Sequence, residues 1–418
     1  MRTANLPQTS DREAPGTPRL AYFGGEPAFA VPRHVGAPNL GDRAVLMRRI
    51  EGLLDRRWLT NRGPLVEEFE RRLAERVGVK HVVVTCNATT ALEIAVRALD
   101  LRGEVIVPSF TFVATAHALQ WQRITPVFGD VEPGGYTLDP DRVEELITPR
   151  TTGIIGVHLF GRTARVAELQ RLADRRGLQL LFDAAHAFGC TREGRTVGGF
   201  GRCEIFSFHA TKFLNAFEGG AVATDDDDLA ERVRLMQNFG FAGEDRVIHV
   251  GVNGKMTEVS AAMGLTSLEA EAGIVAVNRG HYDAYRRELR GVPGLTLMRY
   301  DERERNNYQY VVVEVDRDEA GLSRDQLVAL LRAENVLARR YFHPGCHRME
   351  PYRSLFPHAG LLLPRTEHVT DRVLALPTGG GVDPADVARI GGLLRAMVAN
   401  AAEIRDRWPH AVRRGSAS

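Results

Sequence analysis

The stretch Phe206-Ser207-Phe208-His209-Ala210-Thr211-Lys212, followed by Asn215 and Glu218-Gly219-Gly220, decides the fold and the chemistry of this chain of 418 residues. Apolar residues and hydroxyls flank its lysine, and no second cation lies beside it. Desolvation in such surroundings lowers the pKa of an amine, which suits a nucleophile that forms an imine near neutral pH. The lysine alone is a weak indication, because most lysines are solvated surface charges.

A carboxylate follows a buried strand earlier in the chain. Residues 178–182 have the pattern of a short strand, and Asp183 and then His186 follow its end. An acid at a strand end and a lysine on a later loop form the pair that pyridoxal phosphate requires. The lysine holds this cofactor as a Schiff base, and the acid keeps the pyridine nitrogen protonated, so that the ring acts as an electron sink. We therefore predict Lys212 and Asp183 as the catalytic pair.

Strand and helix patterns alternate along most of the chain. Helices are predicted over residues 44–56, 64–77, 87–99, 111–121, 139–147, 166–176, 227–238, 257–271 and 278–290, and strands over 81–85, 104–107, 125–128, 152–157, 178–182, 203–208 and 221–224. These strands are apolar on both faces, which indicates an α/β domain with a mixed, mostly parallel sheet between helices. The later pattern indicates a smaller α+β domain, with strands over 308–315 and 336–341 and helices over 323–334 and 384–400.

Length and composition predict the domain organisation and exclude several classes of protein. We predict disordered tails over residues 1–19 and 409–418, a large domain over 20–275 and a small C-terminal domain over 276–408. The 54 basic and 53 acidic residues give a net charge of +1, which indicates neither nucleic-acid nor membrane binding. No apolar run approaches the roughly 18 residues of a membrane span, and the N-terminus lacks an apolar signal region. We expect a cytoplasmic protein.

Further positions complete a predicted cofactor site. Ala88 and Thr89 stand where a strand passes into a helix, so free backbone N–H groups and the threonine hydroxyl are placed to bind a phosphate. Ser207 supplies another hydroxyl, and Phe112, just past a strand end, is placed to stack on a pyridine ring. His186 is placed to bond the ring hydroxyl or the carboxylate. Taken singly, each has an ordinary structural explanation, such as a helix cap, a core aromatic or a satisfied histidine.

Four potential metal ligands lie close together in the C-terminal part: His343, Cys346, His347 and Glu350. We predict no metal site there, because no second ligand pair at the usual spacing accompanies them. The intervening Pro-Gly turn instead indicates polar side chains at a pocket rim. The four cysteines of the chain include no CxxC pair and do not make a disulfide framework in a protein of this length.

On these residues the chain resembles the DegT/DnrJ/EryC1/StrS family of nucleotide-sugar aminotransferases, which implies the PLP fold-type I, similar to aspartate aminotransferase. The matching stretches lie between residues 21 and 401: Trp58-Leu59-Thr60-Asn61-Arg62-Gly63-Pro64, residues 104–115, Thr125-Pro126-Val127-Phe128, Val157-His158-Leu159-Phe160-Gly161, residues 183–189, Ser207-Phe208-His209-Ala210-Thr211-Lys212 and Gly251-Val252-Asn253-Gly254-Lys255-Met256. Within the family, residues 86–89, 215–220 and 341–352 look like the 4-aminotransferases of dTDP-4-keto-6-deoxyglucose, which serve amino-sugar pathways for antibiotics.

The resemblance implies a role for each matching residue. Lys212 is implied as the Schiff-base lysine, and Asp183 as the partner of the pyridine nitrogen. Asn253 is implied to reach the cofactor phosphate from the other subunit, which makes a homodimer the smallest active unit. The remaining implied cofactor contacts are Phe112 stacked on the ring, His186 near the ring hydroxyl, and Ala88, Thr89 and Ser207 around the phosphate.

The sequence departs from the common family pattern at several positions. Ala88 stands where many members have Gly, His186 where many have Gln, Phe217 where Gly often occurs, and Lys255 where Arg is common. These departures leave the cofactor chemistry intact, but they weaken any transfer of sugar contacts from the wider family. The dehydratase branch of the family has a histidine in place of Lys212, so the lysine here argues against that reaction.

We therefore predict a PLP-dependent aminotransferase that moves an amino group from L-glutamate to C4 of dTDP-4-keto-6-deoxy-D-glucose. The predicted substrate contacts are His158, Tyr308, Tyr341 and His343. Two alternatives stay open: the same chemistry at C3 of a 3-keto sugar nucleotide, and a PLP-binding regulator without catalysis that uses the fold for another end. A Rossmann-type dehydrogenase is disfavoured, because no GxGxxG motif follows an early strand.

Overall fold

Seven strands form one central sheet in the computed structural model, which describes residues 20–412. In sheet order they are β2 (His81–Thr85), β10 (Gly220–Thr224), β9 (Glu204–Ser207), β6 (Gln179–Asp183), β5 (Thr151–Val157), β3 (Glu104–Pro108) and β4 (Thr125–Gly129). All neighbouring strands run parallel except β10, which is antiparallel to both β2 and β9. The predicted α/β class with a mixed, mostly parallel sheet is confirmed.

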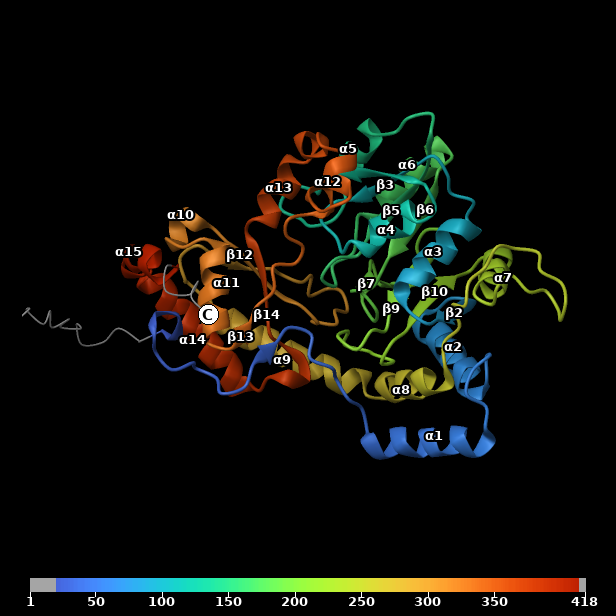
Figure 1. The fold of residues 1–418 in the computed structure, drawn as a ribbon, viewed down its shortest axis with the longest axis horizontal. Coiled ribbons are helices and arrows are strands. Elements are labelled where there is room, and N and C mark those ends of the chain that lie inside the picture. The colour runs from blue at the N-terminus through green and yellow to red at the C-terminus, as the bar shows by residue number, and fades with distance from the viewer. Residues whose placement is uncertain (1–19, 413–418) are drawn as a thin grey trace, which may run out of the picture.

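Helices cover both faces of this sheet (Figure 1). Successive strand residues point to opposite faces; in β2, Val83 therefore packs in one core, while Val82 and Val84 pack in the other. The core around Val83 contains residues of α3 (Ala88–Ala98), α4 (Ala114–Gln120) and α7 (Asp227–Met236). The opposite core contains residues of α1 (Arg43–Arg56), α2 (Pro64–Val77), α5 (Pro140–Glu145), α6 (Val166–Arg176) and α8 (Glu258–Glu269). Burial on both faces explains why the strands are apolar throughout.

A separate core lies in the C-terminal part of the chain. The strands β11 (Leu295–Leu297), β12 (Val311–Val315) and β14 (Val373–Leu376) form an antiparallel sheet. Residues of α11 (Arg324–Ala333), α14 (Pro384–Ala399) and α15 (Ala401–Val412) pack against it. Leu20 and Phe29 are buried in the same core, and β1 (Arg33–His34) pairs with β13 (Val336–Leu337). The described chain therefore begins on the C-terminal domain.

The remaining short elements are β7 (Thr191–Arg192), β8 (Arg195–Thr196), α10 (Arg317–Ala320), α12 (Tyr352–Leu355) and α13 (Pro364–Thr370).

Several predicted elements differ from the structure. The strand predicted over 308–315 begins only at Val311, and the helix predicted over 111–121 begins only at Ala114. The helix predicted over residues 278–290 begins earlier, as α9 (Glu271–Glu288), and it follows α8 end to end along one side of the molecule (Figure 1). Glycine and β-branched residues after Glu271 lower the helix propensity, but Ile274 and Val275 pack against the large core and offset that loss. The strand predicted over 336–341 ends at Leu337, and the residues after it contribute to a cavity wall.

The termini and the domain boundary are described only in part. The predicted N-terminal tail lies outside the described residues. At the other end, α15 continues to Val412, so the first residues of the predicted C-terminal tail are helical. The boundary at residue 275 stays a prediction, and α9 crosses it without interruption. None of the helices within residues 20–412 combines the length and the apolar character that a bilayer span needs.

The ends of several strands meet at one edge of the large sheet. Gly220 begins β10 there and pairs with Thr85 at the end of β2 and with Ser207 at the end of β9. A Cβ atom at Gly220 would lie 2.4 Å from the carbonyl carbon of Asn87, so a glycine is required for this close approach. The segment that starts α3 and the segment that leads to Lys212 therefore leave the sheet side by side. This is the edge at which α/β sheets carry ligands.

Alanine at Gly220 tests this close approach. We expect Gly220→Ala to lower the free energy of unfolding by about 1–3 kcal/mol, because the added methyl group overlaps backbone atoms. Gly392 in α14 is the matched control, since nothing lies within 4 Å of its Cβ position. Gly392→Ala should raise the free energy of unfolding by roughly 0.5–1 kcal/mol through helix propensity. Urea unfolding followed by circular dichroism measures both, and a Gly220→Ala protein as stable as the wild type would contradict the packing argument.

Candidate active site

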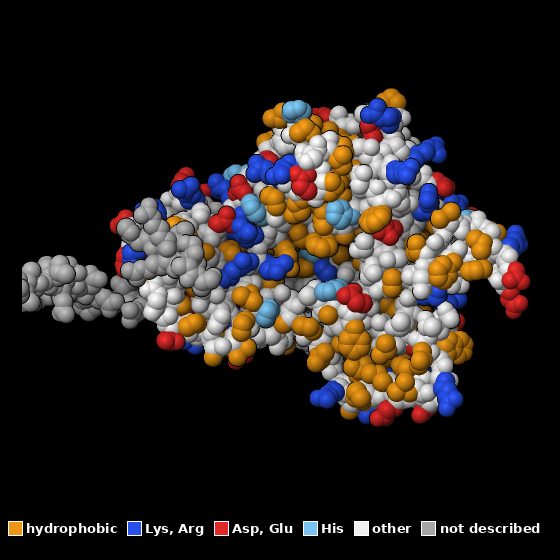
Figure 2. All heavy atoms as spheres, viewed as in Figure 1, with side chains coloured by type: hydrophobic (Ala, Val, Ile, Leu, Met, Phe, Trp, Pro, Cys, Tyr) orange, Lys and Arg blue, Asp and Glu red, His pale blue; other side chains and the backbone are white. Residues whose placement is uncertain are grey.

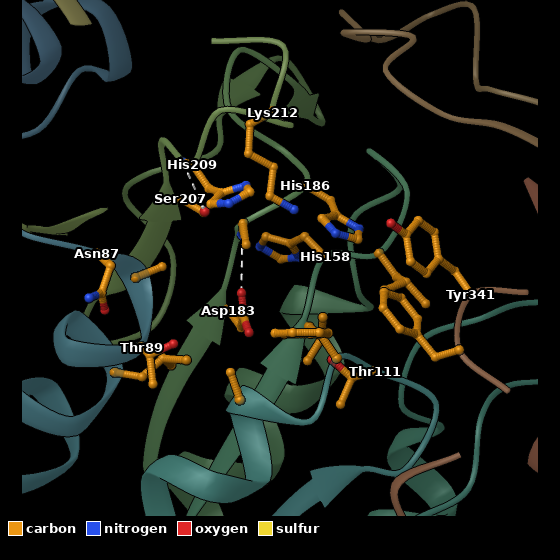
Figure 3. A pocket seen from close by; sticks show the side chains of 18 of the residues that line it. Asn87, Thr89, Thr111, His158, Asp183, His186, Ser207, His209, Lys212 and Tyr341 are labelled. Carbon is orange, nitrogen blue, oxygen red and sulfur yellow. Dashed lines mark hydrogen bonds between the residues drawn. The ribbon is translucent and has the colours of Figure 1, made fainter. Parts of the chain in front are cut away.

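A cavity of about 260 Å³ opens at this edge of the sheet. Hydrophobic, histidine and basic side chains gather on the corresponding face of the molecule, where the two domains meet (Figure 2). Lys212 points into the cavity, Asn87 and Thr89 lie on one side of it, and Tyr341 lies on the other (Figure 3). The cavity wall brings together these predicted site residues: Ala88, Thr89, Phe112, His158, Asp183, His186, Ser207, Lys212 and Tyr341. Three others lie away from it: Tyr308, His343 and Asn253.

Lys212 supplies the amine of this cavity. Its Nζ donates a hydrogen bond to the hydroxyl of Tyr310 at 3.3 Å. Protein atoms around the amine disfavour its charged form and lower the pKa of Lys212 to about 8, while the negative charge of Asp183 acts in the opposite direction. The neutral, nucleophilic amine is therefore populated close to physiological pH, as the sequence predicted.

Asp183 ends β6 and faces the same cavity. Its Oδ2 accepts a hydrogen bond from Thr115 Oγ1 at 2.9 Å, and its Oδ1 accepts one from the Ala185 N–H at 3.1 Å. Burial raises the pKa of Asp183, and these two hydrogen bonds and the charge of Lys212 limit that rise. A cation brought into the cavity would favour the carboxylate form further. The site therefore provides a fixed, buried acid that is suited to a protonated ring nitrogen.

His186 is held as a neutral imidazole. The Phe160 N–H donates to its Nδ1 at 3.3 Å, so the neutral ring carries its proton on Nε2. Burial, together with the nearby charge of Lys212, holds the pKa of His186 well below its ordinary value. The ring packs against Tyr310, with 4.3 Å between centroids. His186 therefore offers a hydrogen-bond donor without adding a second cation beside Lys212.

The start of α3 offers donors for an anion. The side chain of Asn87 caps the helix by accepting from the Thr90 N–H at 2.8 Å. The N–H groups of Ala88 and Thr89 have no hydrogen-bond partner within the described part of the chain. Ser207 lines the same side of the cavity as the start of α3 (Figure 3). Free amides at a helix start and nearby hydroxyls fit a phosphate group, and the cap at Asn87 bonds the Thr90 N–H without occupying those of Ala88 and Thr89.

Aromatic rings line the rest of the cavity. Phe112 leaves 57% of its surface exposed, which is unusual for phenylalanine. An exposed ring on the cavity wall can stack on a planar ligand. Phe342 lies 6.3 Å from it between centroids, and Tyr341 lies next to Phe342. The predicted position of Phe112 at the cavity is therefore supported, whereas its stacking role stays a prediction.

His158 has a structural environment. Its Nε2 lies 2.8 Å from Glu204 Oε1, its Nδ1 accepts from the Ala164 N–H at 3.0 Å, and its ring stacks on Phe182. Both nitrogens are engaged, so neither is free for a substrate hydroxyl. The predicted polar contact of His158 with the sugar is not supported by this geometry, although its ring reaches the cavity wall.

The remaining predicted residues have partners outside the cavity. Tyr308 is buried against other tyrosines of the C-terminal domain, including Tyr300 at 4.8 Å between centroids. His343 lies 3.4 Å from Asp371, and its substrate contact is not supported. Asn253 pairs with Asn238 in an isolated bridge. Its contact with the phosphate site of a second subunit stays a prediction.

The potential metal ligands of the C-terminal part have separate partners. His347 lies between Ser109 and Glu367, at 2.6 Å from each. Glu350 accepts from Arg353, and Cys346 is fully buried. No group of three or more potential ligands forms within residues 20–412. His347 instead joins the loop after β3 to the C-terminal domain, so it does not belong to the pocket rim that we predicted.

Several cavity residues were not predicted. Tyr310, which bonds Lys212, is 98 residues away in the chain, and Thr115, which bonds Asp183, is 68 residues away. Arg339 belongs to the segment that was predicted as a continuous strand, and Phe342 lies one residue past it. No local motif marks these positions: Tyr310, Arg339 and Phe342 depend on how the two domains pack, and Thr115 depends on how α4 packs beside β6. A hydroxyl one turn into the helix after Phe112 was the one available sign for Thr115.

Known proteins share this sequence and this fold. Residues 42–395 match the DegT/DnrJ/EryC1/StrS aminotransferase family. The chain belongs to this family. A dTDP-4-amino-4,6-dideoxy-D-glucose transaminase from Escherichia coli is 38% identical over 86% of this chain and 97% of its own length. The GDP-perosamine synthase of Caulobacter vibrioides is 35% identical over 81% of this chain and 91% of its own length. The crystal structure of DesI in the presence of its TDP-sugar product is 50% identical, with a TM-score of 0.90, over 93% of this chain and 99% of that one.

Membership of the DegT/DnrJ/EryC1/StrS family confirms the resemblance that the motifs predicted. The chain is an aminotransferase, and its relatives act on sugars that carry a nucleotide. Its fold is consistent with the predicted PLP fold-type I, because the DesI structure matches it over nearly the whole chain. Aminotransferases of this family depend on pyridoxal phosphate. The cavity with Lys212 and Asp183 is therefore the candidate active site.

Proposed function

We propose that this aminotransferase binds pyridoxal 5′-phosphate and moves an amino group from L-glutamate to C4 of dTDP-4-keto-6-deoxy-D-glucose. One observation carries the proposal: a desolvated amine, Lys212, and a buried acid, Asp183, face the same cavity. The name of the Escherichia coli relative places the amino group at C4, and DesI was solved with a TDP-sugar product. The first supports C4 over the C3 alternative, and the second supports a TDP-sugar as the substrate class.

The cavity residues fit the cofactor. The free N–H groups of Ala88 and Thr89 and the hydroxyl of Ser207 would hold its phosphate. Phe112 would cover one face of the ring, and Asp183 would pair with the ring nitrogen. When bound, the cofactor supplies an electron sink for the negative charge that develops at the reacting carbon.

The protein's own part in the reaction is to place and move a proton. Lys212, with its lowered pKa, would accept at Nζ the proton that leaves the substrate carbon and would later release it again. Burial raises the pKa of Tyr310 well above its ordinary value, so its hydroxyl stays protonated beside the amine. His186 stays neutral at the same time. Of these three side chains, Lys212 is therefore the one whose charge changes near neutral pH.

We also infer a homodimer. Several large apolar side chains between residues 239 and 252 are exposed, and the loop of which they are part leads to Asn253: Phe239, Phe241, Val247, Ile248, Val250 and Val252. Exposed apolar clusters of this kind mark interaction surfaces. If a second copy of the chain covered this loop, Asn253 of one subunit would lie near the phosphate site of the other. Sedimentation at micromolar concentration measures the state, and a monomer at that concentration would contradict a shared site.

Replacement of the lysine tests the chemistry. Lys212→Ala should fail to convert dTDP-4-keto-6-deoxy-D-glucose with glutamate, because no other amine occupies its place, whereas Lys80→Ala, an exposed surface variant, should match the wild type. NMR of the wild-type product determines which carbon of the sugar carries the amino group. Nitrogen at C3 of a 3-keto substrate, with no reaction at C4, would favour the alternative aminotransferase. Cofactor absorbance that does not respond to glutamate would favour a regulator.

The pKa of Lys212 has a measurable consequence. The rate at which the cofactor-free protein takes up pyridoxal phosphate should rise with pH and level off above about pH 8, because the neutral amine is the form that attacks the aldehyde. Stopped-flow absorbance measures this rate. Asp183→Asn removes the anion that favours the charged amine, so the midpoint should move to lower pH. A wild-type midpoint near the ordinary lysine value of about 10 would show that the amine is not desolvated.

A further inference from the structure

The cavity contains one arginine that has no role in the chemistry described above. Apart from two tyrosines, the ionisable residues on its wall are Asp183, Lys212, His158, His186, His209, Glu218 and Arg339. His158 pairs with Glu204, and His209 lies 3.4 Å from Glu218. Arg339 takes part in none of the ion pairs formed within residues 20–412. It is therefore a permanent positive charge on the cavity wall without a protein counter-ion.

The position of Arg339 is fixed by its backbone. Its N–H donates to the Ala375 carbonyl at 3.1 Å, and its carbonyl accepts from the Ala375 N–H at 2.7 Å, which ties it to β14. Its guanidinium carbon lies 5.3 Å from the centroid of the Tyr341 ring. A cation held against an aromatic face keeps its N–H groups available at the edge. Arg339 is thus anchored by its backbone, is exposed to solvent and contributes to the cavity wall.

Arg339 stands at the end of the cavity that the cofactor phosphate does not use. Tyr341, against which it packs, lies on the side opposite to Asn87 and Thr89 (Figure 3). The free amides of α3 satisfy one anion at the first end. An unpaired guanidinium at the second end indicates a second anion, because planar oxyanions accept two parallel hydrogen bonds from arginine.

We infer that Arg339 binds an oxyanion of the substrate in both half-reactions, an inference that rests on the proposed function. Glutamate and the sugar nucleotide must in turn place their reacting carbon at the same point beside Lys212. In glutamate, two methylene groups separate the distal carboxylate from that carbon. In a 4-keto hexose nucleotide, the first phosphate leaves the ring on the side opposite to C4. Each substrate therefore extends an oxyanion away from Lys212, and one arginine serves both in succession.

The neighbouring arginine provides a matched control. Arg340 lies 3.0 Å from Asp325 and does not line the cavity. Arg340→Gln removes the same charge one residue away, but it leaves the cavity wall unchanged. Arg339→Gln removes the unpaired charge and keeps a side chain of similar polarity. Arg339→Lys keeps the charge but loses the bidentate geometry, so it should recover part of the lost affinity.

The first measurement concerns the amino donor. Rapid-mixing absorbance follows the conversion of the cofactor-loaded enzyme by glutamate or by glutamine, which lacks the distal charge. The wild type and Arg340→Gln should favour glutamate by roughly 10-fold or more in apparent affinity, the size expected for a charge-assisted hydrogen bond. Arg339→Gln should lose this preference, mainly through weaker binding of glutamate. A preference that persists in Arg339→Gln overturns the inference.

The second measurement concerns the phosphate and requires no turnover. Calorimetric titration with dTDP should show binding to Arg339→Gln that is weaker by roughly 10-fold than binding to the wild type, with Arg340→Gln unchanged. The inference requires both effects, so an effect on one ligand alone overturns it. Failure of the proposed function is recognised separately, because the wild type would then not transfer nitrogen from glutamate to the keto sugar at all. Unchanged pyridoxal phosphate uptake by Arg339→Gln confirms that this variant is folded.

Discussion

The removal of a lysine amine from water is the constraint on which the rest of this structure depends. A charged amine loses hydration free energy when it is buried, unless it becomes neutral or meets an anion. Lys212 meets both conditions in part, since its pKa falls to about 8 and Asp183 faces the same cavity. Asp183 in turn depends on the hydrogen bonds from Thr115 and Ala185. Each buried charge therefore offsets some of the cost of the other, and neither is favourable alone.

The sheet keeps these groups together through close backbone contact. Gly220 lies between the ends of β2 and β9 and touches the carbonyl of Asn87, where a side chain would not fit. The start of α3 and the segment that leads from β9 to Lys212 are consequently positioned by main-chain hydrogen bonds. Main-chain positions vary less than side-chain positions, so the distance between the phosphate end and the amine is set by the fold. A cofactor of fixed length requires such a fixed distance.

The sequence predicted the parts of the site that depend on short, contiguous segments. Asp183 is the last residue of a recognisable strand, and Lys212 and the start of α3 lie in short, characteristic segments. Contacts between distant segments were not predictable in the same way. Tyr310 reaches Lys212 from another domain, and Glu204 satisfies His158 from 46 residues away, which removes the free nitrogen that the sequence alone left open. Packing between segments that lie far apart in the chain, within one domain or between two, decides such cases.

The two domains divide the work of the cavity. The large domain supplies every group that we assign to the cofactor, and it does so from strand ends and a helix start that the sheet holds rigidly. The C-terminal domain supplies Tyr310, Arg339, Tyr341 and Phe342, which lie on or near strands β12 and β13. This second wall contains no group on which the acid–base chemistry depends, apart from the hydroxyl beside Lys212. Asp183, whose charge acts on the pKa of Lys212, belongs to the large domain, so substitutions at Arg339 or Tyr341 can alter which substrate is bound without removing that charge.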